Sequence, residues 1–275
     1  MSLHKTICLA LLHALIIFSP SCKKTVGSGM VAPPVVTPPV TPAPTLNYQL
    51  VWSDEFNGTA IDMANWNFET GGSGWGNNEK EYYQAANATI EDSNLVITAK
   101  KETVGSNPYT SARMTTADKQ TFTYGKIEAR MKLPVGQGLW PAFWALGANI
   151  KTVNWPACGE LDIMEHINAD NLIYGTIHWD NNGHASISDK TTTTPQDYHV
   201  YGVEWEPTGI TWYVDSVKYE QADIANGINN TAAFAKPFFL ILNLAVGGNW
   251  PGQTVDESKL PAKLYIDYVR VYQKK

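Results

Sequence analysis

Residues 159–166 read Gly-Glu-Leu-Asp-Ile-Met-Glu-His and place three carboxylates within a few positions of one another. Apolar Leu161 and Ile163 alternate with the first two acids, which is the period of a half-buried β-strand. Like charges on one face of a strand repel each other, so the pattern indicates a function. We favour paired-carboxylate chemistry on a sugar, in which one acid attacks and another donates a proton. An exposed strand with solvated charges is the alternative.

Glu165 breaks the alternation of this strand. Residues two apart share a face, so a regular strand would point Glu160 and Asp162 one way and Glu165 into the core. A buried carboxylate without a partner is very costly. A β-bulge near residues 163–164 would return Glu165 to the acidic face. We therefore predict a bulge inside the motif.

Aromatic residues gather near the acidic segment. The chain has 10 Trp and 13 Tyr, and Trp140 and Trp144 lie four apart just before the motif. Aromatic rings stack on the flat C–H faces of sugars, so we predict that Trp140, Trp144 and Trp179 line a cleft. Large aromatic side chains also dominate protein cores. Four further tryptophans are assigned to the core: Trp52, Trp66, Trp205 and Trp212.

The charge balance restricts the classes of partner. The chain has 275 residues with 20 Lys+Arg against 26 Asp+Glu, for a formal net charge of −6. This balance disfavours nucleic acid as a partner. The sequence shows no basic amphipathic stretch that would suit a membrane surface. The length allows one large β domain or two small domains.

The first residues indicate export. Residues 1–21 resemble a signal peptide of the lipoprotein type, because Lys5 precedes an apolar run over residues 7–18 that is too short to span a membrane. Cys22 follows directly and is predicted to be lipidated, with ordinary secretion as the alternative. Residues 22–46 are rich in Pro, Val and Thr and predict an extended tether. We expect a monomer, lipid-anchored to a bacterial membrane at the cell envelope or surface, with no other membrane contact.

The remaining cysteines and the histidines indicate neither a disulfide framework nor a zinc motif. Cys8 leaves with the signal peptide, so Cys158 is unpaired and is predicted to be a buried, inert thiol rather than a catalytic one. No zinc-ligand spacing joins the histidines of the domain, which are His166, His178, His184 and His199.

Short strand patterns separated by turn residues fill the chain from Tyr48 onward. No long helical period occurs. The pattern predicts an all-β domain, either a sandwich of two antiparallel sheets or a barrel, with residues 140–165 in the middle of a concave face. The clearest strand candidates are residues 95–99, 124–133, 199–205, 210–215, 238–245 and 264–272.

The acidic motif resembles the catalytic signature of glycoside hydrolase family 16, and the extra residue before its second Glu is similar to the laminarinase-like branch. This resemblance covers about residue 48 to the C-terminus. It implies a β-jelly roll of two curved antiparallel sheets, concanavalin A-like, with an open cleft, and a catalytic domain over residues 47–275. Further segments fit the same branch: residues 51–56, 76–79, 111–113, 140–144, 242–248 and 265–272.

The resemblance implies roles for the three acids. Glu160 matches the nucleophile, Glu165 the general acid/base and Asp162 the assisting acid between them. Two close carboxyl groups cannot both ionise cheaply, so one of them keeps a proton. The resemblance implies a separation of about 5–5.5 Å between the two Glu carboxyls, and hence retention through a glycosyl-enzyme intermediate.

The resemblance also implies binding residues and one metal site. Catalysis is expected to need no cofactor. Relatives often carry a structural calcium ion on the sheet face away from the cleft, and Glu55 and Asp267 match positions linked to it. Calcium takes about six to eight oxygen ligands, so two acids are only part of such a site. The positions that line the cleft in relatives match Asn77, Arg113, Trp140, Trp144, His178 and Trp250.

The resemblance implies an endo-acting hydrolase of β-1,3-glucan, such as laminarin. The first alternative is the same chemistry on mixed-linkage glucan or on an algal galactan such as agar. A further alternative is a non-catalytic glucan-binding protein, which the presence of both Glu160 and Glu165 disfavours. Transglycosylation remains open, because a sugar can capture a retaining intermediate in place of water.

Overall fold

Alternation of apolar and polar residues builds a sheet that we call the outer sheet. The computed structural model describes residues 48–275. In β8 (Gly125–Lys132) the apolar side chains of Ile127, Ala129 and Met131 are buried, as the predicted alternation requires. The sheet has the spatial order β15-β14-β13-β8-β17-β5-β4, and β1 also pairs with β17. Its strands are β1 (Tyr48–Asp54), β4 (Ala88–Glu91), β5 (Asn94–Ala99), β8 (Gly125–Lys132), β13 (His199–Glu206), β14 (Gly209–Val214), β15 (Val217–Asp223) and β17 (Ala262–Lys274).

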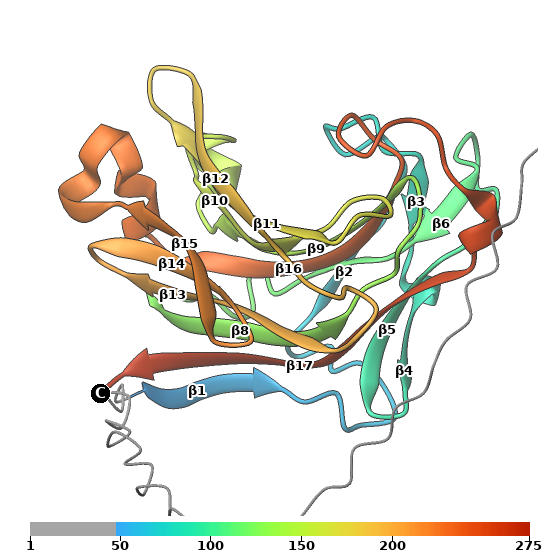
Figure 1. The fold of residues 1–275 in the computed structure, drawn as a ribbon, viewed down its shortest axis with the longest axis horizontal. Helices are drawn as coiled ribbons and strands as arrows, with labels where there is room; N and C mark the ends of the chain where they lie inside the picture. The colour runs from blue at the N-terminus through green and yellow to red at the C-terminus, as the bar shows by residue number, and fades with distance from the viewer. Residues whose placement is uncertain (1–47) are drawn as a thin grey trace, which may run out of the picture. The chain divides into compact units, whose positions relative to one another are not determined.

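A second antiparallel sheet, the inner sheet, packs against the outer sheet (Figure 1). Its order is β12-β11-β10-β9-β16-β7-β2, so the acidic strand β10 lies near the middle. The sheet curves, and its concave face points away from the outer sheet. Its strands are β2 (Asn67–Glu69), β7 (Arg113–Thr115), β9 (Leu139–Gly147), β10 (Glu160–Glu165), β11 (Leu172–Asp180), β12 (His184–Thr192) and β16 (Phe238–Val246).

The hydrophobic core lies between the two sheets. Trp66, Trp205 and Trp212 are fully buried there and Trp52 packs against them, as predicted. The all-β jelly-roll prediction and all six strand candidates are confirmed. The other described elements are short: β3 (Glu81–Tyr83), β6 (Tyr109–Ser111), α1 (Ile150–Val153) and the 3-10 segments η1 (Ala85–Asn87), η2 (Ala225–Ala235) and η3 (Glu257–Lys259).

The N-terminal predictions concern residues that the structure does not describe. The signal peptide, the tether and Cys22 lie outside residues 48–275. Within that range, none of the helices combines the length and the apolar composition that crossing a membrane would need.

Strand β10 contains the predicted bulge. Asp162 pairs with Trp144 of β9, but Met164 pairs with Phe143, the next residue along, so one extra residue sits in β10. The pairing with β11 shifts over the same stretch, between Asp162 and Glu165. The extra residue lets Ile163 and Met164 both enter the core, although they are neighbours in sequence.

A side chain from the outer sheet holds the bulge. Trp212 of β14 is fully buried, and its indole Nε1 donates a 2.8 Å hydrogen bond to the carbonyl oxygen of Asp162. A buried carbonyl without a partner costs about 1–3 kcal/mol. The contact therefore ties the bulge of the inner sheet to the outer sheet.

We expect Trp212→Phe to lower the free energy of unfolding by about 2–4 kcal/mol, because it removes this hydrogen bond and leaves a small cavity. Trp205→Phe is a matched control, since Trp205 is also fully buried and donates a 3.0 Å bond from its Nε1 to the carbonyl oxygen of Phe234. Urea unfolding should show similar losses for both variants. Only Trp212→Phe should speed hydrogen–deuterium exchange in β10, and equal protection of β10 in the two variants would contradict the role of Trp212.

Candidate active site

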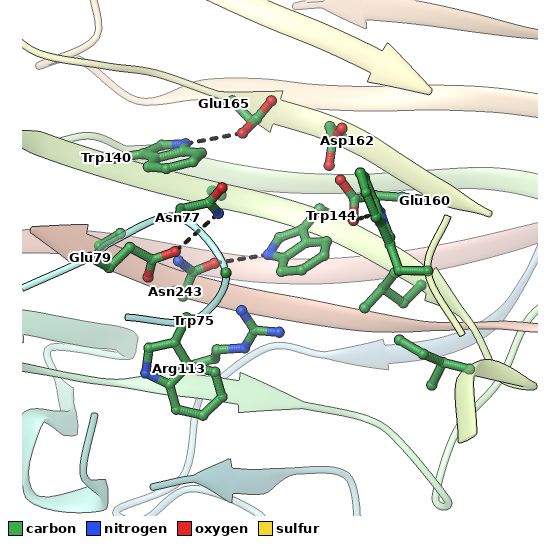
Figure 2. A pocket seen from close by; sticks show the side chains of 16 residues that line it. Trp75, Asn77, Glu79, Arg113, Trp140, Trp144, Glu160, Asp162, Glu165 and Asn243 are labelled. Atoms are coloured by element: carbon green, nitrogen blue, oxygen red, sulfur yellow. Dashed lines mark hydrogen bonds between the residues drawn. The ribbon is translucent and has the colours of Figure 1, made fainter. Parts of the chain in front are cut away.

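A cleft of about 370 Å³ lies on the concave face of the inner sheet (Figure 2). Strands β9, β10 and β16 supply most of its floor, and the segment 75–79 closes one side. The lining residues are Trp75, Gly76, Asn77, Glu79, Arg113, Trp140, Ala142, Trp144, Leu146, Ile150, Trp155, Glu160, Asp162, Glu165, Asn243 and Ala245.

The bulge brings all three acids of β10 into this cleft. Glu160, Asp162 and Glu165 line it together, although the last two lie three apart in sequence. Gly159 directly precedes the strand with a φ of +80°, and a Cβ atom there would lie 2.9 Å from Cζ of Phe238. Only glycine therefore fits where the chain turns into the acidic strand.

Uncharged indole groups hold the two glutamates. Trp140 Nε1 donates a 3.0 Å hydrogen bond to Oε1 of Glu165, and Trp155 Nε1 donates a 3.1 Å bond to Oε2 of Glu160. Each contact orients a carboxyl group without supplying a positive charge. The two glutamates can therefore exist in different protonation states.

Burial raises the pKa values of the three acids. Desolvation, and then the charge of Asp162, raises the pKa of Glu160 to about 8. Desolvation raises the pKa of Asp162 to about 8 as well. Desolvation and the charges of Asp162 and Glu160 raise the pKa of Glu165 well above the usual range. A raised pKa allows Glu165 to hold the proton that a general acid needs.

His178 of β11 lies beside the acids. Its Nε2 is 3.3 Å from Oδ2 of Asp162 and 3.8 Å from Oε1 of Glu160. Its Nδ1 lies 2.8 Å from Nε2 of His184, and Trp155 packs over both imidazole rings. His178 is therefore a neighbour of the carboxyl groups rather than a residue of the core.

Arg113 and Trp144 form another part of the floor. The Arg113 guanidinium lies 4.7 Å from the centre of the Trp144 ring and 5.1 Å from that of Trp75, and it pairs with Glu69. Trp144 Nε1 donates a 2.8 Å hydrogen bond to Oδ1 of Asn243. These contacts fix a flat aromatic surface next to a cation, which suits a ligand with apolar faces and hydroxyl groups.

Asn77 belongs to a polar network that lines one side of the cleft. Its Nδ2 donates to Oε1 of Glu79 at 3.2 Å, and the Tyr83 hydroxyl donates to Oε2 of Glu79 at 3.0 Å. The Tyr83 hydroxyl in turn accepts a 3.1 Å bond from Nδ2 of Asn243. This chain of bonds keeps the segment 75–79 against the cleft.

Two tryptophan predictions have different outcomes. Trp250 is 40% exposed and packs edge-on against Trp140, a residue of the cleft, and against Tyr174, with ring centres 5.5 and 4.9 Å away. The prediction that Trp179 lines the cleft is wrong. Trp179 is only 4% exposed, and its Nε1 bonds the carbonyl oxygen of Asn229, because its side chain enters the core.

Sequence reasoning missed Trp75, Trp155 and Asn243. Asn243 could have been found, because it is the single polar residue in the apolar strand β16. Trp155 lies in the loop before Gly159, and no local pattern predicts that its indole reaches Glu160. Cys158 is buried, as predicted, and desolvation raises its thiol pKa to about 11.

The two residues matched to a calcium site are each paired with an arginine in this structure. Glu55 accepts bonds of 2.9 and 2.7 Å from Arg270, and Asp267 accepts a 2.7 Å bond from Arg130. The calcium site stays a prediction. Among residues 48–275, one group of three potential metal-ligating side chains lies close together, and it consists of Glu160, Asp162 and His178.

This chain is similar in sequence to known proteins. The family Glycosyl hydrolases family 16 matches residues 76–270. The clotting factor G alpha subunit of Tachypleus tridentatus is 47% identical over 232 residues, which cover 82% of this chain but 34% of that protein, so the chain spans about a third of that relative. A beta-glucanase of Rhodothermus marinus is 40% identical over 245 residues, which cover 82% of this chain and 86% of that protein.

A solved structure has the same architecture. The laminarinase catalytic domain of Thermotoga maritima gives a TM-score of 0.79 at 45% identity and covers 83% of this chain and 99% of that chain. The family match over residues 76–270 includes the strand that carries the acids. On the family match, the identity to its relatives and the shared fold, the chain belongs to glycosyl hydrolases family 16.

Proposed function

We propose that this chain is an endo-acting, retaining hydrolase of β-1,3-glucan, in which Glu160 is the nucleophile and Glu165 the general acid/base. The observation that carries the proposal is the bulge in β10, which puts both carboxyl groups into one cleft. Names of similar proteins support the substrate, since the relatives include a beta-glucanase and a laminarinase catalytic domain. The reaction uses the protein's own carboxyl groups.

In the first step, Glu165 donates its proton to the glycosidic oxygen while Glu160 attacks the anomeric carbon. The bond to the leaving sugar breaks, and an ester forms between Glu160 and the glycosyl group. The raised pKa of Glu165 suits it to this role. The indole of Trp140 keeps the Glu165 carboxyl in place through Oε1 and leaves Oε2 free of this bond.

In the second step, Glu165 takes a proton from a water molecule that attacks the anomeric carbon from the opposite side. The ester breaks, and Glu160 leaves as a carboxylate. Two inversions give net retention. Asp162 acts between the glutamates, because its charge raises the pKa values of both.

Aromatic residues on both sides of the acids favour cleavage inside a chain. Trp155 donates a hydrogen bond to Glu160, whereas Trp140 donates one to Glu165 and packs against Trp250. Sugar rings can therefore stack on both sides of the scissile bond. An enzyme that trims chain ends would instead need one side closed, so we assign endo action.

A panel of polysaccharides tests the proposed substrate. We expect reducing ends to appear fastest on laminarin, more slowly on mixed-linkage β-glucan, and not on agarose. The products from laminarin should be a ladder of oligosaccharides early in the reaction, which identifies endo action by chromatography. Faster release from agarose than from laminarin would replace the glucan assignment, and no release from any polymer would favour a binding protein.

Variants that lack the side chain of Glu160 or of Glu165 should lose activity and should give different products when azide is added. We expect Glu160→Ala and Glu165→Ala each to lower kcat/KM at least about 1000-fold. With an aryl glycoside and azide, Glu160→Ala should form the α-glycosyl azide by one inversion, and Glu165→Ala the β-glycosyl azide by two. NMR of the products distinguishes them. The reverse assignment of anomers would exchange the two roles.

The matched control for these variants is Glu220→Gln. Glu220 is a buried carboxyl group of β15 outside the cleft. The kcat/KM of the Glu220→Gln variant should stay within about twofold of that of the parent protein. Circular dichroism checks that all variants are folded. A comparable loss in this control would mean that any buried acid matters, and would remove the case for Glu160 and Glu165.

Asp162→Asn should move the pH profile of kcat/KM to lower pH by about one unit. The charge of Asp162 raises the pKa of Glu160, whose ionisation sets the acid limb, and that of Glu165, whose deprotonation sets the alkaline limb. Loss of that charge lowers both pKa values, so both limbs shift in the same direction. Initial rates between about pH 4 and 10 measure this shift. An unchanged profile, or a shift to higher pH, would show that Asp162 does not act through its charge.

A further inference from the structure

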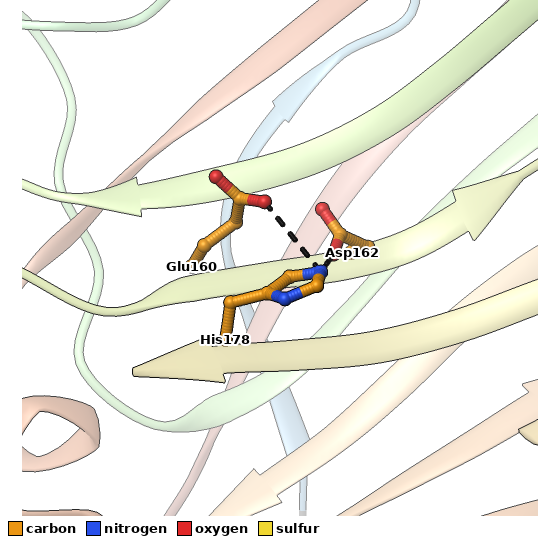
Figure 3. A group of neighbouring side chains, drawn as sticks. All are labelled: Glu160, Asp162 and His178. Atoms are coloured by element: carbon orange, nitrogen blue, oxygen red, sulfur yellow. Dashed lines mark ion pairs between the residues drawn. The ribbon is translucent and has the colours of Figure 1, made fainter. Parts of the chain in front are cut away.

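Three potential metal ligands converge on one side of the cleft (Figure 3). One potential ligand atom each of Glu160, Asp162 and His178 lies within 4.8 Å of the other two. The imidazole nitrogen is 3.3 Å from the Asp162 oxygen and 3.8 Å from the Glu160 oxygen. An ion about 2.1 Å from the nitrogen and from the Asp162 oxygen would subtend an angle of about 100°, close to the tetrahedral geometry of zinc.

Asp162 supplies an independent sign of a missing partner. The residue is 3% exposed, and its Oδ2 makes no hydrogen bond although it faces the other two ligand atoms. The 3.3 Å approach of His178 Nε2 is thus a close contact without hydrogen-bond geometry. A buried carboxylate oxygen without a donor is costly, and a cation between the three atoms would satisfy it.

His184 completes the surroundings of a metal ligand. Nδ1 of His178 lies 2.8 Å from Nε2 of His184. When Nδ1 carries the proton, it donates to His184 and leaves the lone pair of His178 Nε2 free for an ion. Metal-bound histidines commonly donate their other N–H to a neighbour in this way, which fixes the tautomer.

We propose that Glu160, Asp162 and His178 bind one Zn²⁺ ion, with the fourth position open to the cleft. One nitrogen and two carboxylate oxygens form a ligand set that zinc accepts. Binding displaces the proton that the carboxyl groups otherwise hold, and that proton passes to solvent. Mg²⁺ prefers octahedral oxygen ligands and binds poorly to such a set.

Zinc binding also blocks the reaction, and this consequence rests on the proposed function. A zinc-bound Glu160 cannot attack the anomeric carbon, and the ion occupies space beside Asp162 where a sugar would lie. The inhibition is therefore competitive with the polysaccharide: the apparent KM rises with zinc concentration and kcat does not change.

Calorimetry tests the binding without any measurement of activity. The full chain, without a polyhistidine tag and after treatment with a chelator, is titrated with ZnCl₂ and separately with MgCl₂. We expect saturable 1:1 binding of Zn²⁺ only. Asp162→Asn and His178→Gln should each weaken the binding at least about tenfold. Co²⁺ in place of Zn²⁺ should give visible absorption bands typical of a four-coordinate site, and these should be lost in Asp162→Asn.

Two further variants are matched controls. Glu165→Gln changes a third acid of the same cleft, and Glu220→Gln changes a buried acid outside it. Both should bind Zn²⁺ within about threefold of the parent protein if the ligands are those proposed. Absence of 1:1 binding, or equal affinity in Asp162→Asn and the parent, would overturn the proposal. Loss of binding in Glu165→Gln would overturn the assigned ligand set.

The inhibition experiment separates the two proposals. Laminarin hydrolysis is measured at several zinc concentrations and restored with chelator. Competitive, reversible inhibition supports both the site and the proposed function. If no polysaccharide is cleaved, the proposed function fails, while the calorimetry still decides the metal site. If cleavage is normal and zinc has no effect at saturating calorimetric concentration, the inhibitory role of the site is wrong.

Discussion

The extra residue in β10 is the constraint on which the rest of the site depends. It changes the side on which Glu165 lies and shifts the register of β10 against both β9 and β11. The pairing of these two strands with β16 and β12 stays regular. Because the side-chain period of a strand is two, no substitution in a regular β10 could place both Asp162 and Glu165 in the cleft. The irregularity needs a partner, and Trp212 supplies it from the other sheet. A hydrogen bond on the core side of the inner sheet thus helps to place the acids of the concave face.

Three adjacent carboxyl groups are unfavourable in a partly buried cleft, and the surrounding residues limit this cost without removing it. The indoles of Trp140 and Trp155 donate to the glutamates but carry no charge. A lysine in either place would lower the pKa values of both acids and hold them ionised together. An uncharged donor leaves the raised pKa values in place. The choice of tryptophan therefore preserves the difference in protonation that a retaining reaction needs.

The sequence predicts the fold and the centre of the site for identifiable reasons. Period-two alternation predicted strands such as β8, and the conflict between that period and Glu165 predicted the bulge. Contacts between distant segments were not predictable, because no local pattern encodes them: Trp155 reaches Glu160 from a loop. The error at Trp179 has a similar origin, since a strand that flanks the cleft also sends alternate side chains into the core.

The properties that suit the cleft to proton transfer also suit it to a metal ion. Asp162 Oδ2 lacks a donor, and the neighbouring atoms of Glu160 and His178 can likewise accept a positive charge. The negative charge of these groups can be neutralised by a proton that they share. It can also be neutralised by a divalent ion that they coordinate. Adding a permanent donor beside Asp162 would satisfy it as well, but would remove the coupling that raises the pKa of Glu165. Susceptibility to a competing cation therefore follows from the arrangement that keeps the catalytic proton in the cleft.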